Sequence, residues 1–191
     1  MPTDYKCPFC GKVYKTEKGF QAHTCLKKQR YDNFNLFSYM VWRTWNKSVG
    51  IKLSTSDEKN RMRFIGAKEY KTFEDFSNFL IKMNPPNVID YIKWLVNKQI
   101  DSKYWKVDSY YHRWLVEYTK SENKINAIMR SKQYLEQTNE KVEELSESRL
   151  YNYLYNGRIS PWYVSYIDKT LFLKMGDDLL SKIQDIISIA I

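Results

Sequence analysis

Apolar residues recur every three to four positions along most of the chain after residue 30, which is the period of an α-helix. Between residues 33 and 49 they occupy positions 34, 37, 41, 42, 45 and 49. Similar spacing is found over residues 88–96, in an aromatic stripe over residues 103–119, and in a last segment that carries Leu179, Leu180, Ile183, Ile186 and Ile187. These patterns predict a mainly α-helical protein, with an α-helical domain over residues 31–191.

Two short motifs predict where helices begin. Thr55-x-x-Glu58 and, less strictly, Thr72-x-x-Asp75 resemble capping boxes. The second motif predicts a helix that begins near Thr72. That helix should end before Asn84-Pro85-Pro86, because proline cannot continue a helix and restricts the residue before it.

Residues 121–155 predict one long amphipathic helix or two. The apolar positions are Ile125, Ile128, Leu135, Val142, Leu145 and Leu150, and the outer face carries Glu136, Glu140, Glu143 and Glu144. This acidic face argues against nucleic-acid binding there. Beyond it, Asn156-Gly157 predicts a turn, and Ser160-Pro161 predicts an N-cap with proline at the first helical position.

The first 30 residues follow a different pattern, Cys7-x2-Cys10-x12-His23-x-Cys25. Two cysteines separated by two residues can direct both thiolates at one ion from a tight turn. The twelve residues between Cys10 and His23 match the spacing of a Cys2His2 zinc finger. The pattern predicts one Zn²⁺ bound by Cys7, Cys10, His23 and Cys25.

Tyr14 and Phe20 stand where such a finger carries its two apolar residues. Residues 1–30 therefore resemble a small ββα zinc finger with a basic extension, in which the metal supplies the folding energy. The second histidine is replaced by Cys25, only two positions after His23. Since residues i and i+2 of a helix point about 200° apart, the finger helix should end near His23. A three-ligand site with Cys25 free is the alternative.

The net charge of +9 is unevenly distributed. Residues 1–30 carry seven basic and two acidic residues. Residues 31–82 carry nine basic and six acidic residues, and residues 83–191 carry fifteen basic and fourteen acidic residues. This excess favours a polyanion bound at the N-terminal end, with solubility as the alternative explanation. The candidate phosphate-binding residues are Lys15, Lys18, Lys27, Lys28 and Arg30.

The positions from which a finger reads bases are Thr16, Gly19 and Ala22. None of these side chains can form the bidentate hydrogen bonds that distinguish one base from another. We therefore expect largely sequence-independent binding to the phosphate backbone, of DNA rather than RNA. A finger that binds protein is the rival interpretation.

The sequence contains no glycine-rich phosphate loop, no nucleophile elbow and no His-Glu-x-x-His site, so we expect no enzyme. A nuclease whose acidic residues lie far apart in the sequence is the alternative. Trp42 and Trp45 can stack nucleobases, although their helical spacing favours the core. His112 has no other histidine to pair with outside the zinc site, which favours a structural role.

All three cysteines lie in the first 25 residues and serve as candidate ligands, which suits a reducing compartment. No apolar run approaches the roughly 20 residues of a membrane-spanning helix. The N-terminal residues lack the apolar core of a signal peptide. We therefore expect a cytoplasmic protein without a membrane partner.

Beyond the finger, scattered motifs carry a wider resemblance. They are Cys25-Leu-Lys-Lys-Gln-Arg30, Tyr70-Lys-Thr-Phe-Glu-Asp-Phe76, Asp101-Ser-Lys-Tyr-Trp105 and Gly157-Arg-Ile-Ser-Pro-Trp162. Together with the finger, they resemble uncharacterised zinc-finger proteins of T4-like and related tailed phages. The resemblance implies a phage-encoded protein in a bacterial cytoplasm and carries over no established activity.

Two functional hypotheses follow. The first is a nucleic-acid-binding accessory protein that acts in replication, repair or transcription. The second is an adaptor whose finger and helical domain dock on a host or phage polymerase or replication protein. Phosphate binding should weaken steeply with salt, whereas an apolar protein interface should not.

Overall fold

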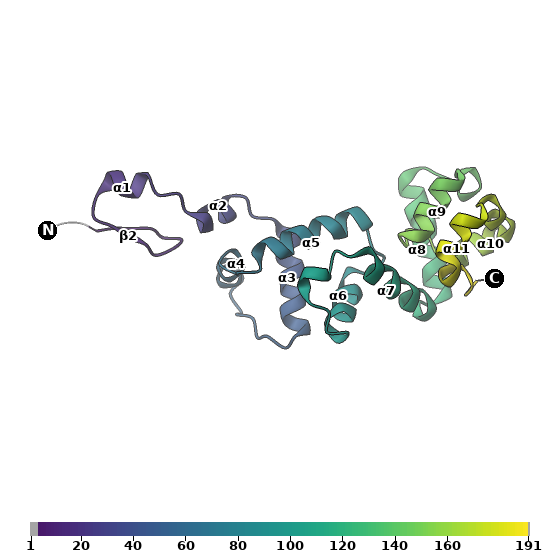
Figure 1. Ribbon diagram of the computed structural model, residues 1–191, viewed down its shortest axis with the longest axis horizontal. Coiled ribbons are helices and arrows are strands. Elements are labelled where there is room, and N and C mark those ends of the chain that lie inside the picture. Colours follow the sequence, from purple (N-terminus) through teal and green to yellow (C-terminus); the bar gives the residue numbers. More distant parts are fainter. Residues whose placement is uncertain (1–3, 191) are drawn as a thin grey trace. The chain divides into compact units, whose positions relative to one another are not determined.

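The computed structural model describes residues 4–190 (Figure 1). This part of the chain is mainly α-helical, as predicted, with one two-stranded sheet near the N-terminus. Contacts divide the chain into two compact units, Met1–Ser77 and Asn78–Ile191. The predicted boundary between a finger and a helical domain at residue 30 falls inside the first unit and stays a prediction.

The first unit begins with a ββα module. Strand β1 (Tyr5–Lys6) pairs antiparallel with β2 (Val13–Tyr14), with Tyr5 opposite Tyr14. Helix α1 (Glu17–Gln21) follows directly. Its N-cap is Thr16, whose hydroxyl accepts a hydrogen bond of 3.1 Å from the Gly19 N–H. The module thus has the ββα arrangement that the finger pattern predicts.

The rest of the first unit is helical. It contains α2 (Leu26–Asp32), α3 (Leu36–Ser48), α4 (Asp57–Ile65) and the start of α5 (Tyr70–Met83). Its core is aromatic: the ring of Phe64 lies 5.6 Å from that of Trp42 and 4.8 Å from that of Tyr70. Trp42 is buried in this core, which favours packing over the base-stacking alternative.

Both capping predictions differ from the structure. The N-cap of α4 is Ser56, one residue after the predicted Thr55, and its hydroxyl accepts from the Lys59 N–H. Helix α5 begins at Tyr70, so Thr72 lies in its first turn and is not its cap. The Tyr70 ring is buried against Phe64, and this long-range contact, which a local capping motif does not reveal, lies at the observed start of the helix.

The second unit begins within α5 and contains six further helices. They are α6 (Val88–Asn97), α7 (Asp108–Ser121), α8 (Lys124–Thr138), α9 (Glu147–Tyr155), α10 (Pro161–Asp168) and α11 (Asp177–Ile187). Short 3₁₀ turns are η1 (Ser102–Tyr104), η2 (Val142–Glu144) and η3 (Lys169–Lys174). Helix α10 packs on α8 and α11 packs on α9.

The segment 121–155 forms two helices, α8 and α9, separated by η2. The break follows Asn139, whose left-handed backbone (φ 53°) ends α8. Of the predicted apolar positions, Leu135, Val142, Leu145 and Leu150 are buried. The prediction that Ile125 belongs to the apolar face is wrong, because this residue lies in the first turn of α8 with 66% of its surface exposed.

Several predicted boundaries are confirmed. Helix α5 ends at Met83, directly before Asn84-Pro85-Pro86. Gly157 forms a turn with a left-handed backbone (φ 69°). Ser160 caps α10, and Pro161 occupies its first turn. Among the described helices, none has the length and apolar character needed to cross a bilayer.

Candidate metal centre

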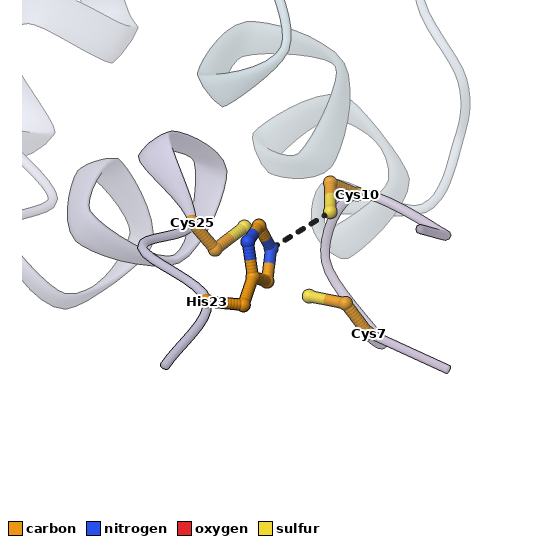
Figure 2. Close-up of side chains that lie close together, drawn as sticks. All are labelled: Cys7, Cys10, His23 and Cys25. Carbon is orange, nitrogen blue, oxygen red and sulfur yellow. Dashed lines mark hydrogen bonds between the residues drawn. The ribbon is translucent and has the colours of Figure 1, made fainter. Parts of the chain in front are cut away.

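Four potential metal ligands converge in the ββα module. Cys7 and Cys10 come from the turn between β1 and β2, His23 follows the end of α1, and Cys25 immediately precedes α2. Their ligand atoms all lie within 4.8 Å of one another. Figure 2 shows the four side chains directed toward a common point.

The turn between the strands places the first two ligands. The backbone N–H of Cys7 donates to the carbonyl of Lys12 at 2.8 Å, and the N–H of Gly11 donates to the carbonyl of Cys7 at 2.9 Å. Gly11 adopts a left-handed backbone (φ 73°), which a residue with a Cβ rarely adopts. This tight turn brings the thiols of Cys7 and Cys10 to the same side.

The end of α1 places the other two ligands. The helix ends at Gln21 with Ala22 as its C-cap, so the chain leaves helical geometry before His23. This is the early end that the His23–Cys25 spacing predicts. The chain can then bring both side chains to the cluster, where His23 Nε2 lies 3.2 Å from Cys10 Sγ.

Sequence reasoning missed a second role of Cys25. Its side chain is the N-cap of α2, and Sγ accepts a hydrogen bond of 3.4 Å from the Lys28 N–H. Ser, Thr, Asp and Asn are the usual caps, so a cysteine gives no recognisable capping signal. The thiol therefore joins the ligand cluster to the start of the next helix.

The donor set fits a zinc ion. Zn²⁺ takes four sulfur and nitrogen ligands in a tetrahedron, and donors at about 2.3 Å from the ion would lie about 3.8 Å apart. The four donor atoms lie within 4.8 Å of one another, which is close enough for one ion to contact all of them. Cys7 and Cys25 are buried, whereas Cys10 is exposed. Sulfur and imidazole donors also exclude the oxygen-liganded ions Ca²⁺ and Mg²⁺ as preferred occupants.

The electrostatics of the thiols are consistent with a cation site. A hydrogen bond from the Cys10 backbone N–H is the main factor that lowers the pKa of the Cys7 thiol to about 6. At Cys10, a backbone hydrogen bond at Lys12 lowers the pKa, but desolvation and the neighbouring Cys7 and Cys25 outweigh it and raise the pKa. Crowded thiolates repel one another, and a divalent cation would offset that repulsion.

Aromatic rings cover one side of the cluster. The Tyr14 ring lies 5.0 Å from the His23 ring and 6.2 Å from Phe20, and Tyr5 stacks on Phe20 at 6.1 Å. Tyr14 and Phe20 thus occupy the apolar positions that the finger pattern predicts. So small an apolar cluster buries little surface, so a bound metal would supply much of the stability of the module.

The predicted phosphate-binding residues have different surroundings. Lys15 and Lys18 are exposed on the module, and Lys27 is half-buried and lies against Gly66. Lys28 Nζ forms an ion pair of 2.6 Å with Asp32, and this exposed pair can be exchanged for another anion at little cost.

Arg30 is occupied within the first unit. Its Nη1 donates to the carbonyls of Ile65 at 2.8 Å and Ala67 at 3.2 Å, and its guanidinium lies 4.4 Å from the centre of the Tyr70 ring. These contacts hold α2 against the segment between α4 and α5. These contacts occupy Nη1 of Arg30, and its role in phosphate binding stays a prediction. The two carbonyls belong to distant residues, which no local motif reveals.

No family model matches the chain, and no curated protein or solved structure matches it. The resemblances to a zinc finger and to phage proteins therefore receive no support from these comparisons. The cluster of Cys7, Cys10, His23 and Cys25 carries the functional argument, and it is compatible with a bound zinc ion.

Proposed function

We propose that this protein is a zinc-binding accessory protein whose ββα module holds nucleic acid by its phosphates. The observation that carries the proposal is the convergence of three thiols and one imidazole in a small module surrounded by lysines. The metal has a structural role in this proposal. Four protein ligands leave no open coordination position for a substrate or an activated water.

The proposed contacts are electrostatic and independent of sequence. Lys15, Lys18 and Lys27 supply the positive charge, and Lys28 contributes when it exchanges Asp32 for a phosphate. Thr16 already uses its hydroxyl to cap α1, and Gly19 and Ala22 have no polar side-chain atom. Phosphate contacts of this kind give affinity without distinguishing base sequence.

A protein-binding adaptor is the second candidate, and one observation favours it. Apolar side chains are exposed in and beside the module: Val13 at 50%, Leu26 at 59% and Tyr31 at 41%. Such residues can contribute to the apolar centre of a protein interface. The wider proposal, that the protein acts in replication, repair or transcription in a phage-infected bacterium, rests on the resemblance of the short motifs alone.

The first test is metal content. Elemental analysis of protein purified without chelator should give one zinc ion per chain. A stoichiometry near zero would remove the metal hypothesis and with it the basis of the proposed module.

The second test is a binding titration by fluorescence anisotropy, at several salt concentrations, on two unrelated duplexes, one single-stranded DNA and one RNA. The Lys15→Gln/Lys18→Gln variant should weaken binding similarly on both duplexes and flatten the salt slope by up to about two phosphate contacts. The matched control is Lys93→Gln/Lys120→Gln, which changes exposed lysines of the second unit by the same charge. Absence of binding to all four probes at low salt would leave the adaptor as the better hypothesis.

A further inference from the structure

A small polar cavity in the second unit is lined by two arginines and by no acidic residue. It has a volume of about 220 Å³ and lies between α8, the Pro85–Pro86 segment and the turn at Gly157. Arg130, Gln133, Tyr134 and Gln137 share one face of α8, since they are spaced i, i+3, i+4 and i+7. Arg158 completes the lining, which contains no acidic residue.

The two arginines in this cavity differ in their partners. Arg130 forms a bidentate ion pair with Glu122, with both N–O distances at 2.9 Å, and its Nη1 donates to the carbonyls of Gly157 and Arg158. Its charge is therefore neutralised, and it positions the turn that carries Arg158. Arg130 is a structural element of the cavity wall.

Arg158 has no such counterion among the described residues. Its Nη1 donates to Tyr134 Oη and its Nη2 to the carbonyl of Lys82, both at 3.3 Å, while Nε is buried without a partner. The rings of Tyr134 and Tyr153 lie about 6 Å from the guanidinium and hold it in place. A partly buried, positioned guanidinium without a carboxylate is a recognition group for an anion.

We propose that this cavity binds a phosphate group. Arg158 keeps one N–H on each terminal nitrogen, and the exposed carboxamides of Gln133 and Gln137 add neutral donors from the α8 side. A tetrahedral phosphate can accept from donors on several sides, whereas a planar carboxylate is satisfied by the guanidinium alone. The volume is below the roughly 300 Å³ of a drug-sized pocket, so it suits a phosphate and little more.

The phosphate can belong to a small ester or to a nucleic-acid backbone, and the experiment separates these sources. The full-length protein, as purified, is titrated with inorganic phosphate, AMP, a short oligothymidylate and, at equal ionic strength, acetate. The readouts are the ¹H–¹⁵N signals of Arg158 Nε–H and of the Gln133 and Gln137 carboxamides. Saturable shifts with phosphate and AMP only indicate a small ester, and shifts with the oligonucleotide only indicate the backbone. Either result supports the proposal.

A substitution with a matched control makes the test local. Gln133→Glu places a carboxylate at the cavity and should lower phosphate affinity at least about tenfold. Gln184→Glu changes the charge equally at an exposed site of α11 outside the cavity and should leave the affinity unchanged. Arg158→Lys keeps the charge but loses the planar fork, and should also weaken binding.

Three results would overturn the proposal: no shift of the Arg158 signal at millimolar phosphate, acetate binding as tight as phosphate binding, or equal losses in the Gln133→Glu and Gln184→Glu variants. None of these measurements depends on the metal centre. Failure of the phosphate proposal therefore leaves the proposed zinc module untouched, and a negative zinc analysis leaves the cavity untouched.

Discussion

His112 should make the stability of this protein sensitive to mildly acidic pH. Its ring lies on α7 against the Tyr155 ring, at a centroid distance of 3.6 Å, and Nε2 is buried without a hydrogen-bond partner. Desolvation lowers its pKa from 6.5 to about 4, although Asp108 acts in the opposite direction. The charged groups Arg113, Glu117, Lys182 and Asp185 line the adjacent cavity and balance one another in sign.

The sign and size of the effect follow from proton linkage. Below pH 6.5 the unfolded chain takes up a proton at His112, whereas the folded chain stays neutral there until the pH approaches 4. Folding is therefore favoured less as the pH falls. Between pH 8 and pH 5 these two pKa values correspond to a loss of about 2 kcal/mol in the free energy of unfolding.

The assay is urea denaturation followed by circular dichroism at pH 8 and pH 5, with wild type and His112→Leu. Excess chelator at both pH values keeps metal binding at His23 out of the comparison. The variant should lose about 2 kcal/mol less than wild type between the two pH values, because the titrations of all other groups cancel. Equal losses in the two proteins would refute the reasoning and mean that the His112 ring is solvated.

Three further predictions concern Cys25, the metal and Gly157. Cys25→Ser keeps an N-cap for α2 but removes a thiolate, so zinc retention should fall as far as in Cys10→Ala. Competition with a chromogenic chelator measures this retention, and normal retention in Cys25→Ser would indicate three protein ligands. Chelation should abolish tertiary NMR signals of the ββα module and leave most of the helical circular dichroism, and global unfolding would contradict this. Gly157→Ala places a Cβ 2.6 Å from Leu115 Cδ1 at positive φ and should cost about 2–4 kcal/mol in urea denaturation. Gly50→Ala has positive φ but open space, so it should cost about 1 kcal/mol, and equal costs would argue against the clash.

The sequence predicts the helices well because most of them bury one face. The spacing of apolar residues over 88–96 and the capping pair Ser160-Pro161 are local signals, and the structure has helices at both places. The predicted cap at Thr72 was wrong: α5 begins two residues earlier, at Tyr70, whose ring contacts Phe64 of α4. A contact between residues of different helices leaves no mark in the local pattern.

The convergence of the four candidate metal ligands was also predictable from a local signal. All four lie within 19 consecutive residues at spacings that geometry restricts, and the structure brings them together. The surroundings of Arg30 and Arg158 were not predictable, because their partners include carbonyls of distant residues, Ile65 and Lys82. Every residue has a carbonyl, so the sequence cannot show which of them an arginine will meet.

The double role of Cys25 also has a mechanical consequence. Only Thr24 separates two of the candidate ligands, and α2 begins at the next residue after Cys25. An ion held by His23 and Cys25 would remove the torsional freedom of this short connection, so module and helix would turn as one piece. Without the ion, residues 22–25 would keep that torsional freedom. Metal occupancy would then set the stiffness of the chain where it leaves the module. It would thereby limit how far a partner bound to the module can move relative to α2.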